Sequence, residues 1–573
     1  MKDRIKTWLA RDPDPATRGE LQNLLNDRNT EELSQRFSGR LEFGTAGLRG
    51  LVGAGPARMN RLVIQETSAG LGAYLIDTIP HAAKRGVVVA YDGRPDSHQF
   101  AMDAACVFAA LGIMIYITPA VAATPIAAFG VLDKGAAAGV VVTASHNPPQ
   151  YNGYKVYWEN GAQITPPHDA GIANAIERAA LEPLPWLEFE EGVSSGVICV
   201  QGEDFYRSYI DAIQASPLFS NSSGTPETSI AYTAMHGVGA DVAETLLQEA
   251  GFRRFYSVEC QREPDGRFPT VNFPNPEEPG AMDLVLALAN ENGATLACAN
   301  DPDADRLAVA VRQESGDYQM LTGDMVGVLL ANYLLQQRHS FTPIVCSTIV
   351  SSGMLKSIAA ATGAVHFETL TGFKWLTNVA MDHEDDNHQL LFAYEEALGY
   401  AVGRQVRDKD GLSALLAFAQ MTEQLARQGK TVLDQLELLY RQHGIYMTGQ
   451  RSIALQPGAP PLCERLRNQP PSRIGSSDVI HVDDLSRGIR MHSSGSSEPL
   501  DFPLSDVLIY RLQNGSRVIV RPSGTEPKVK CYYEVVQPVA GDSFDSAMEQ
   551  AKNALAQLMG KHQDSLAVFT GPA

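Results

Sequence analysis

One loop of the chain, TASHNPP (143–149), has residue types suited to nucleophilic chemistry. It directly follows the apolar run GVVV, so Ser145 would stand exposed and geometrically fixed at the end of a strand, as a nucleophile requires. His146 beside it fits either a general base or a structural hydrogen-bond donor. The alternative for the whole loop is a Ser/Asn turn closed by its two prolines. Local features alone leave both interpretations open.

A second loop, NDPDADR (300–306), places the carboxylates of Asp301, Asp303 and Asp305 at alternating positions after the apolar run TLACA. On an extended loop these side chains point the same way and repel one another unless a cation joins them. Hard oxygen ligands favour Mg²⁺ or a similar divalent ion. A calcium-sensor loop is excluded, because its sixth and twelfth positions need Gly and Glu and this chain has arginine at both. The remaining alternative is a solvated acidic turn.

A third loop, RPSGTEPK (521–528), combines cations, hydroxyls and a glycine between two strand-like runs. Arg521 offers a bidentate guanidinium, Lys528 a point charge, and Ser523 and Thr525 neutral donors, while the glycine opens backbone N–H groups to a ligand. These are the requirements of a phosphate clamp. A β-turn with exposed charges is the alternative.

Two further segments carry weaker signals. YEEALGY (394–400) ends a strand-like run, and the adjacent carboxylates Glu395 and Glu396 could accept hydrogen bonds from vicinal sugar hydroxyls. FGTAGLRG (43–50) is a glycine-rich loop with one cation, Arg49, which is compatible with anion binding or with a tight turn.

The elements that must position these loops follow an α/β rhythm. Short β-rich runs alternate with helical stretches, and a strand–loop–helix unit occurs three times with polar residues at the carboxyl end of its strand, where ligands gather in open α/β sheets. The predicted strands are GVVVAYD (86–92), IMIYIT (113–118), GVVVTASH (139–146), SIAYTA (229–234), ATLACAND (294–301) and PIVCST (343–348). The predicted helices cover 62–78, 97–111, 240–251, 281–292, 322–336 and 351–362. From about Gly444 the chain turns Pro- and Ser-rich, and strand-like runs before a helix at 544–560 predict a smaller α+β domain with an antiparallel sheet.

The composition limits the partners and the location. With 573 residues, Lys+Arg 46 and Asp+Glu 66, the net charge of −20 argues against non-specific nucleic-acid binding. The 7 cysteines lie far apart without a CxxC pair, which indicates a reduced, cytoplasmic protein without a disulfide frame or a zinc cluster. The N-terminus lacks an apolar secretory segment. Residues 104–132 are uncharged and long enough to span a bilayer, but Gly112, Pro119 and Pro125 divide them into buried α/β elements, so we expect no membrane span.

Taken together and in this order, the loops resemble the α-D-phosphohexomutase superfamily, which includes the phosphoglucomutase/phosphomannomutase family. The resemblance covers essentially the whole chain and is carried by GTAGLRG (44–50), TASHNP (143–148), DPDADR (301–306), TGFKWL (371–376), YEEALG (394–399) and RPSGTEPK (521–528). YNGYKVYW (151–158), AMHGVG (234–239) and FPTVNFPNPEEP (268–279) are similar to the branch with type-2-like phosphoglucomutases and phosphopentomutases. It implies an α/β fold of four domains around a central cleft, three related α/β domains and a smaller C-terminal α+β domain. We expect domain I, with an N-terminal helical extension, at 1–205, domain II at 206–315, domain III at 316–444 and domain IV at 445–573.

The resemblance also implies a reaction: transfer of a phosphoryl group between the 1-hydroxyl and a distal hydroxyl of a sugar. Ser145 would be the phosphoserine that donates and later recovers the phosphate, and one Mg²⁺ would be held by Asp301, Asp303, Asp305 and a phosphate oxygen of Ser145. Arg306 would approach the phosphoserine. The general base stays open among His146, Arg49, Lys155 and Lys374.

The same resemblance assigns substrate contacts. Glu395 matches the acceptor of sugar hydroxyls, Lys374 and Lys409 match lysines of the cleft, and the loop residues Arg521, Ser523, Thr525 and Lys528 would hold the phosphate that is not reacting. A bisphosphorylated intermediate must then reorient, so we expect a mobile C-terminal domain and activation by a catalytic trace of sugar bisphosphate.

We expect glucose 1-phosphate and glucose 6-phosphate as the substrate pair, with pentose phosphates or phosphomannose as related alternatives. Family members commonly have Ser where this chain has Ala397, and the lost hydroxyl leaves pentose specificity open. A glucose 1,6-bisphosphate synthase would use the same serine and metal loops, and a binding protein without activity is the non-catalytic alternative. An aspartyl phosphatase is disfavoured, because Asp303-Ala304-Asp305-Arg306-Leu307 lacks the threonine of a DxDxT signature. We expect the protein to be a monomer or a homodimer. We expect its binding partner to be a small-molecule sugar phosphate.

Overall fold

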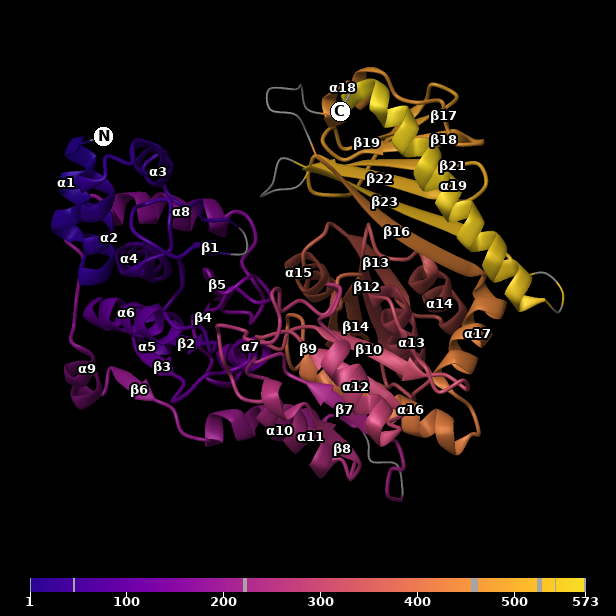
Figure 1. The fold of residues 1–573 in the computed structure, drawn as a ribbon, viewed down its shortest axis with the longest axis horizontal. Coiled ribbons are helices and arrows are strands. Elements are labelled where there is room, and N and C mark those ends of the chain that lie inside the picture. The colour runs from indigo at the N-terminus through magenta and orange to yellow at the C-terminus, as the bar shows by residue number, and fades with distance from the viewer. Residues whose placement is uncertain are drawn as a thin grey trace.

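Four β-sheets, arranged one after another along the chain, organise the molecule (Figure 1). The computed structural model describes residues 2–44, 47–219, 224–454, 462–522, 528–539, 541 and 543–570. Ser523 and Thr525 of the predicted phosphate clamp lie outside the described residues. We number the units around the four sheets as domains I to IV.

Domain I is built on a six-stranded sheet of order β1-β5-β4-β2-β3-β6. Strands β2, β3, β4 and β6 run parallel, whereas β5 is antiparallel to both β4 and β1. Its strands are β1 Leu48–Leu51, β2 Val87–Tyr91, β3 Ile115–Ile117, β4 Ala138–Val142, β5 Tyr151–Trp158 and β6 Ile198–Val200. Its helices are α1 Lys2–Arg11, α2 Pro15–Asn26, α3 Thr30–Arg36, α4 Arg61–Thr78, α5 Ala82–Arg85, α6 Ser97–Ala110, α7 Thr124–Asp133, α8 His168–Ala179 and α9 Phe189–Ser195.

Domain II has a five-stranded sheet of order β11-β10-β9-β7-β8. It is entered through α10 Asp204–Ala215 and the short 3₁₀ turn Pro217–Phe219, so the boundary predicted at 205/206 falls inside a helix. The elements are β7 Ile230–Thr233, α11 Ala240–Glu249, β8 Phe255–Ser257, the 3₁₀ turn Glu259–Gln261, α12 Asp283–Asn292, β9 Leu296–Asn300, β10 Leu307–Arg312 and β11 Tyr318–Met320. Because β11 pairs with β10, this sheet also continues past the boundary predicted at 315/316.

Domain III has a four-stranded sheet of order β13-β12-β14-β15, in which β15 is the antiparallel strand. Its elements are α13 Gly323–Leu335, β12 Thr342–Thr348, α14 Met354–Thr362, β13 Val365–Thr369, α15 Phe373–His383, β14 His388–Glu395, β15 Gly399–Val402, α16 Gly411–Arg427 and α17 Val432–His443. The carboxylate of Asp410 accepts the backbone N–H groups of Leu412 and Ser413, which explains why α16 begins at this point.

Domain IV differs from the other three because all its strand pairs are antiparallel. Its elements are β16 Ile445–Ala454, α18 Leu462–Asn468, β17 Arg473–Ile474, β18 Ser477–Asp484, β19 Ile489–His492, β20 Ser497–Pro499, β21 Leu508–Leu512, β22 Arg517–Pro522, β23 Lys528–Gln537 and α19 Phe544–Thr570. Helix α19 crosses the outer face of this sheet and ends ten residues beyond the predicted helix (Figure 1).

Domains I, II and III repeat one connection that matters for the site. In each, a parallel strand leads through a loop into an antiparallel neighbour: β4 to β5, β9 to β10 and β14 to β15. The serine loop, the aspartate loop and the YEEALG segment occupy these three equivalent places. The repeat therefore delivers one polar loop from each domain, at the carboxyl end of a buried strand.

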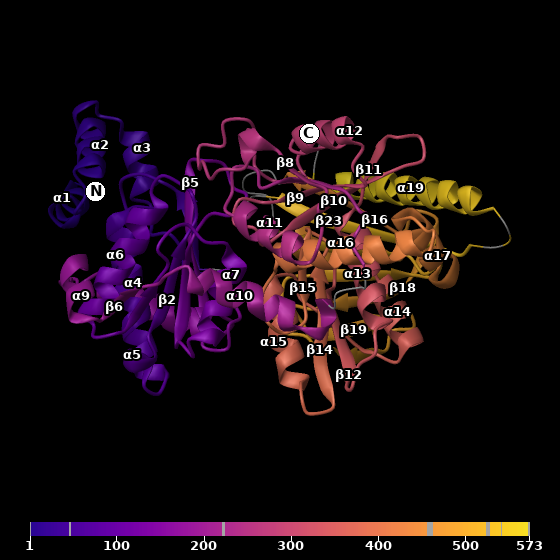
Figure 2. The same ribbon diagram turned by 90° about the horizontal axis from the view of Figure 1, so that it is seen from below.

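The domains share apolar contacts. One core cluster joins domains II and III and includes Ile126 and Tyr157 of domain I. A second cluster fills domain I, and a third fills domain IV. Seen from below, domain I stands on one side of the molecule and domains III and IV on the other (Figure 2).

The uncharged segment 104–132 forms part of α6, then β3 and most of α7, within the domain I sheet and its covering helices. Across the described ranges, none of the helices has the length and apolar character needed to cross a membrane.

Candidate active site

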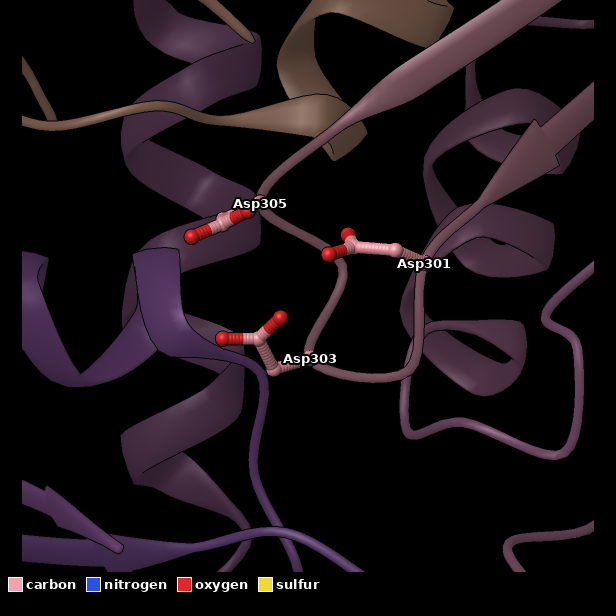
Figure 3. Close-up of side chains that lie close together, drawn as sticks. All are labelled: Asp301, Asp303 and Asp305. Atoms are coloured by element: carbon pink, nitrogen blue, oxygen red, sulfur yellow. The ribbon is translucent and has the colours of Figure 1, made fainter. Parts of the chain in front are cut away.

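The aspartate loop connects β9 to β10 and buries three carboxylates. Asp301, Asp303 and Asp305 are at most 1 % exposed, and one oxygen from each lies within 4.8 Å of the others (Figure 3). Ala304 between them has a φ of 57°, a left-handed conformation that closes the turn. The alternating spacing seen in the sequence therefore becomes a converging set of oxygens.

Two of these carboxylates keep an oxygen without a partner in the described part of the chain. Oδ1 of Asp303 and Oδ1 of Asp305 are buried and accept no hydrogen bond. A buried, unpaired carboxylate oxygen is costly, and three hard oxygens at this spacing suit Mg²⁺. Burial, together with the charges of Asp305 and Asp303, raises the pKa of Asp301 well above its usual range. The residues present therefore fit a divalent cation.

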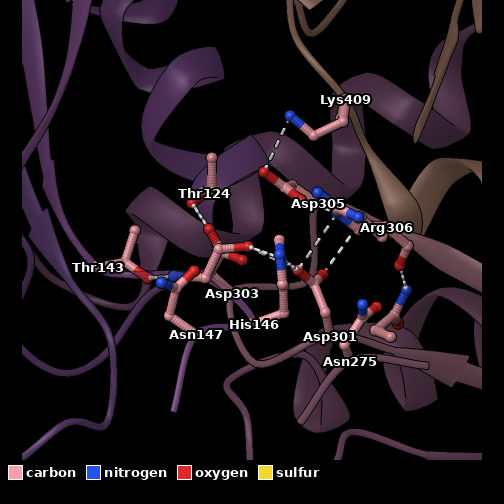
Figure 4. Close-up of polar contacts among 12 residues, drawn as sticks. Thr124, Thr143, His146, Asn147, Asn275, Asp301, Asp303, Asp305, Arg306 and Lys409 are labelled. Carbon is pink, nitrogen blue, oxygen red and sulfur yellow. Dashed lines mark hydrogen bonds and ion pairs between the residues drawn. The ribbon is translucent and has the colours of Figure 1, made fainter. Parts of the chain in front are cut away.

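Lysines from two other domains reach the same loop. Lys155 of β5 places Nζ 2.6 Å from Asp303 Oδ2 and 2.8 Å from Asp305 Oδ2. Lys409, which precedes α16 in domain III, has Nζ 3.2 Å from Asp305 Oδ2 (Figure 4). Burial opposes the charged form of Asp303, but the charge and hydrogen bond of Lys155 lower its pKa below the usual range. The site thus carries fixed cations as well as carboxylates.

The serine loop meets the aspartate loop directly. Ser145, 3 % exposed and with a φ of 51°, donates from Oγ to Asp301 Oδ2 at 2.8 Å. His146 Nδ1 lies 3.2 Å from the same Oγ. Burial, reinforced by Arg306 and Arg49, lowers the pKa of His146 well below its usual range, so its ring is neutral near pH 7. The structure therefore joins two loops whose contacting residues, Ser145 and Asp301, are 156 residues apart in the chain.

Two arginines flank these loops. Arg306 has its guanidinium 3.9 Å from Asp301 and 4.0 Å from Asp305, and its buried Nε has no hydrogen-bond partner in the described ranges. Arg49 of β1 donates to Asn147 Oδ1 at 3.0 Å, which brings it against the serine loop. Both cations face the region where Ser145 meets the aspartate loop.

Sequence reasoning missed the side chains that shape the serine loop. Arg94 is 4 % exposed and donates to the carbonyl oxygens of Ser145 at 2.7 Å, Asn147 at 2.6 Å and Pro148 at 2.9 Å. Asp92 accepts from Thr143 Oγ1 at 2.7 Å. A signal existed, because YDGR follows the β2 run directly and polar residues at a strand end mark a ligand edge.

The YEEALG segment presents two half-buried carboxylates in different directions. Burial raises the pKa of Glu395, and nearby Lys409 and Arg306 oppose the rise, which places Glu395 beside the cations of the site. Glu396 instead accepts from Ser351 Oγ at 2.9 Å and Thr348 Oγ1 at 3.2 Å. Burial and the charge of Glu395 raise the pKa of Glu396 to about 7. Glu396 also lines a cavity of about 540 Å³ that domain IV helps to close.

The remaining predicted residues gather on another wall. Arg521 at the end of β22 donates to Thr371 Oγ1, and its guanidinium lies 6.0 Å from the ring of Tyr532. Lys374, three residues after Thr371, is the second residue of α15. Within the described ranges, no hydrogen bond or ion pair links Lys374 or Arg521 to the serine or aspartate loop. Lys528 begins β23. Domain IV therefore approaches the TGFKWL segment rather than the aspartate loop.

Four family profiles match the chain in order. They describe the phosphoglucomutase/phosphomannomutase alpha/beta/alpha domain I at 40–182, domain II at 207–316, domain III at 322–443 and the C-terminal domain at 495–551. The chain belongs to the phosphoglucomutase/phosphomannomutase family. The predicted resemblance, the α/β fold of four domains and the assignment as an enzyme of the intramolecular phosphotransferase class are confirmed.

Named relatives cover nearly the whole chain. A "Probable phosphoribomutase" of Schizosaccharomyces pombe is 38% identical over 99% of this chain and 99% of its own. A human phosphopentomutase is 35% identical over 97% of this chain and 94% of its own, and a mouse glucose 1,6-bisphosphate synthase is 34% identical over 96% and 95%. Among solved structures, the open form of pp63/parafusin, a phosphoglucomutase from Paramecium, has a TM-score of 0.67 at 20% identity and covers 94% of this chain and 97% of its own, which supports the fold.

Proposed function

We propose that this enzyme is a phosphosugar mutase that works through phosphorylated Ser145 and a bisphosphorylated sugar. The observation that carries the proposal is the 2.8 Å contact of Ser145 Oγ with Asp301, at the edge of a buried set of oxygens suited to Mg²⁺. Phosphoryl transfer depends mainly on how precisely the reacting groups are positioned. Ser145 meets this requirement, because its turn is strained and is held in place by hydrogen bonds. The chemistry that Mg²⁺ supplies when bound is neutralisation of charge on the phosphoryl oxygens.

The side chains divide the work. In the first half-reaction the bond from Ser145 Oγ to phosphorus breaks while a sugar oxygen bonds to phosphorus, and the proton that the sugar hydroxyl gives up passes through a base to the departing Ser145 Oγ. Of the candidate bases, His146 has Nδ1 within hydrogen-bond distance of Oγ, and its neutral ring is able to accept that proton. Lys155 is held by two ion pairs and serves as a fixed charge. The Nε of Arg306, which donates no hydrogen bond within the described ranges, is available to donate to a phosphoryl oxygen.

In this proposal, residues of domains III and IV contact the substrate. Glu395 accepts the sugar hydroxyls, next to Lys409, while Arg521, Ser523, Thr525, Lys528 and Lys374 hold the phosphate that is not reacting. The buried Nε of Arg521 has no hydrogen-bond partner among the described residues, as a phosphate donor should be. After the first transfer the bisphosphate reorients, so that its other phosphate faces Ser145. A trace of free bisphosphate rephosphorylates any enzyme that has lost its phosphate.

For the sugar we place pentose 1- and 5-phosphates ahead of the glucose 1- and 6-phosphates expected from the sequence. Relatives named phosphoribomutase and phosphopentomutase span nearly the whole chain, and Ala397 lacks the hydroxyl that the common family pattern provides. Glucose phosphate stays the second candidate. The enzyme acts in the cytoplasm in this proposal.

The test is a coupled assay with Mg²⁺ and a trace of the matching sugar bisphosphate. Ribose 1-phosphate, glucose 1-phosphate and mannose 1-phosphate are compared by kcat/KM, with Ser145→Ala as the inactive control. Ribose 1-phosphate turning over fastest, with a dead control that still binds the sugar phosphate, is the expected result. Equal activity of the Ser145→Ala protein contradicts the phosphoserine mechanism, and a preference for glucose 1-phosphate contradicts the choice of sugar.

A second candidate function is synthesis of a sugar bisphosphate from a high-energy phosphate donor. It is favoured by the 34% identity to a glucose 1,6-bisphosphate synthase, because the same serine and aspartate loops would serve. Mass spectrometry of the product separates the two: net bisphosphate formation from a high-energy phosphate donor and sugar monophosphate supports the synthase, and unchanged donor supports the mutase.

A further inference from the structure

Strand β5 of domain I sends two side chains toward the other domains. Lys155 and Tyr157 are separated by one residue, so they share a face of the strand. Lys155 pairs with the aspartate loop of domain II, as described above. Tyr157, fully buried, donates from its hydroxyl to Asp408 Oδ2 of domain III at 2.6 Å. Strand β5 therefore contacts both of the other domains, domain II through Lys155 and domain III through Tyr157.

Asp408 immediately precedes Lys409 and is also fully buried. Its Oδ2 accepts from Tyr157 and from Gln163 Nε2 at 2.9 Å, both in domain I. Its Oδ1 accepts the backbone N–H of Lys409 at 2.7 Å. The carboxylate is thus satisfied by three neutral donors, two of which come from another domain.

The ammonium of Lys409 lies between two carboxylates. Nζ is 3.2 Å from Asp305 Oδ2 and 3.6 Å from Asp408 Oδ1. A buried carboxylate that loses a donor regains stability by drawing in the nearest cation. The donors on Asp408 therefore decide how strongly it competes with Asp305 for the lysine.

We propose that Tyr157 is a positioning residue, which satisfies Asp408 and so leaves the Lys409 ammonium directed at Asp305 and the substrate. The inference rests on the proposed function, in which Lys409 contacts the sugar phosphate. It gives domain I a part in substrate binding by domain III, through a hydroxyl that touches neither the sugar nor the metal loop. Tyr157 acts through Asp408, so removing the carboxylate charge should reverse the effect of removing the hydroxyl.

A matched control exists on the same segment. Tyr209 of α10 donates to both oxygens of Asp410, at 2.9 Å and 2.8 Å, and both side chains are buried. The described residues show no lysine paired with Asp410. Tyr209→Phe therefore removes an equivalent buried Tyr–Asp hydrogen bond without changing the competition for Lys409.

The experiment measures kcat, KM and Tm for five variants with the sugar 1-phosphate that wild type prefers. Tyr157→Phe should raise KM about tenfold with little change in kcat, as loss of a binding cation predicts. Tyr157→Phe with Asp408→Asn should return KM to within about twofold of wild type, because a neutral amide does not attract the ammonium. In a Lys409→Met background, Tyr157→Phe should add nothing. Tyr209→Phe should lower Tm as much as Tyr157→Phe does and leave KM unchanged.

Failure takes two distinguishable forms. A wild-type chain that turns over no sugar phosphate overturns the proposed function, and this inference with it. If the wild type is active, two results overturn the inference and leave the proposed function standing. One is that Tyr157→Phe raises KM by the same factor in the wild-type and the Lys409→Met backgrounds. The other is that adding Asp408→Asn to Tyr157→Phe does not lower KM again.

Discussion

At the scale of single residues, the aspartate loop keeps buried carboxylate oxygens that the described side chains around it do not satisfy. Three buried carboxylates lie within one ion's reach, and two of their oxygens have no partner among the described residues. Added Mg²⁺ should therefore raise Tm by several degrees at saturating concentration, because a ligand that binds only the folded state stabilises it by about 2.7 kcal/mol at a hundred times its Kd.

Asp301→Asn tests that prediction, because the amide keeps the size of the side chain and removes one charge. The variant should show no Mg²⁺-dependent rise in Tm, and without Mg²⁺ it should be at least as stable as wild type, since the repulsion is relieved. Asp283→Asn, at an exposed position on α12, is the control and should respond to Mg²⁺ like wild type. Scanning calorimetry with and without EDTA makes the measurement, and an unchanged Mg²⁺ response in Asp301→Asn would falsify the metal assignment.

Lys374 makes a second prediction at this scale, through pH. Burial lowers its pKa to about 8, and the charge of Asp169 opposes that shift in part. As the pH rises through about 8 the free enzyme loses this cation, so its affinity for phosphate should fall. The value of kcat/KM, which reports ionisations of the free enzyme, should therefore decline above pH 8. Lys374→Arg keeps its charge and should shift the decline to higher pH. An identical decline in both proteins would assign it to another group.

The residues that sequence reasoning found share a local signature. Ser145 and the three aspartates occur as runs of polar residues directly after apolar strands, so spacing marks them as candidates and the family resemblance supplies the expected role of the serine. Arg94 also follows an apolar strand, but what Arg94 and Asp408 do depends on loops contributed by distant segments. Their importance becomes visible when the fold brings carbonyl oxygens, a tyrosine and a lysine to them.

At the scale of elements, the N-terminal helices have a structural task that the sequence did not indicate. Glu20 of α2 and Arg36 of α3 form an ion pair at 2.7 Å and hold both backbone groups of Ala54. Ala54 N–H donates to Glu20 Oε2 at 2.9 Å, and its carbonyl accepts from Arg36 at 3.1 Å. Gly53 and Gly55 beside it have φ values of 152° and 105°, in a region that favours glycine. The segment leads back to β1, which carries Arg49.

Arg36→Met should therefore loosen the segment after β1. It removes the guanidinium from Glu20 and from the carbonyl oxygen of Ala54, which costs about 1.5–3 kcal/mol for a hydrogen bond to a charged group. Hydrogen exchange should accelerate at residues 48–59, and Tm should fall. Arg4→Met, on an exposed face of α1, is the control and should leave both unchanged. Slow exchange at 48–59 in Arg36→Met would show that the pair does not hold this segment.

Most regular elements of domains I to III could be predicted from sequence because their strands are buried on both faces and read as continuous apolar runs, such as β2 and β4. The predicted helix at 62–78 matches α4 to within one residue. Domain IV was harder. Strands β19 and β20 are half-buried or exposed, so they carry no apolar signal, and they form by pairing within the sheet.

At the scale of the whole molecule, domain IV is docked on domain III through a buried arginine. Arg517 of β22 pairs with Glu534 at 2.8 Å, its cross-strand neighbour, and with Glu368 of domain III at 2.9 Å. It also donates to the carbonyl oxygens of Ile349, at 3.1 Å, and Ser351. Apolar side chains of both domains, among them Val350 and Ile519, surround the contact. Because Ser351 Oγ in turn donates to Glu396, the junction reaches the YEEALG segment.

Arg517→Met tests whether this junction orients domain IV. Removing the cation takes the charge partner from buried Glu534 and one of two cations from half-buried Glu368, and breaking a buried ion pair typically costs about 3–5 kcal/mol. The radius of gyration from small-angle scattering should increase, and KM should rise because the Arg521 loop no longer faces domain III. Arg490→Met breaks a bidentate pair with Asp483 inside domain IV, at 2.5 Å and 3.1 Å, and should change neither quantity. If Arg517→Met keeps the wild-type radius and KM, the apolar contacts alone hold domain IV in place.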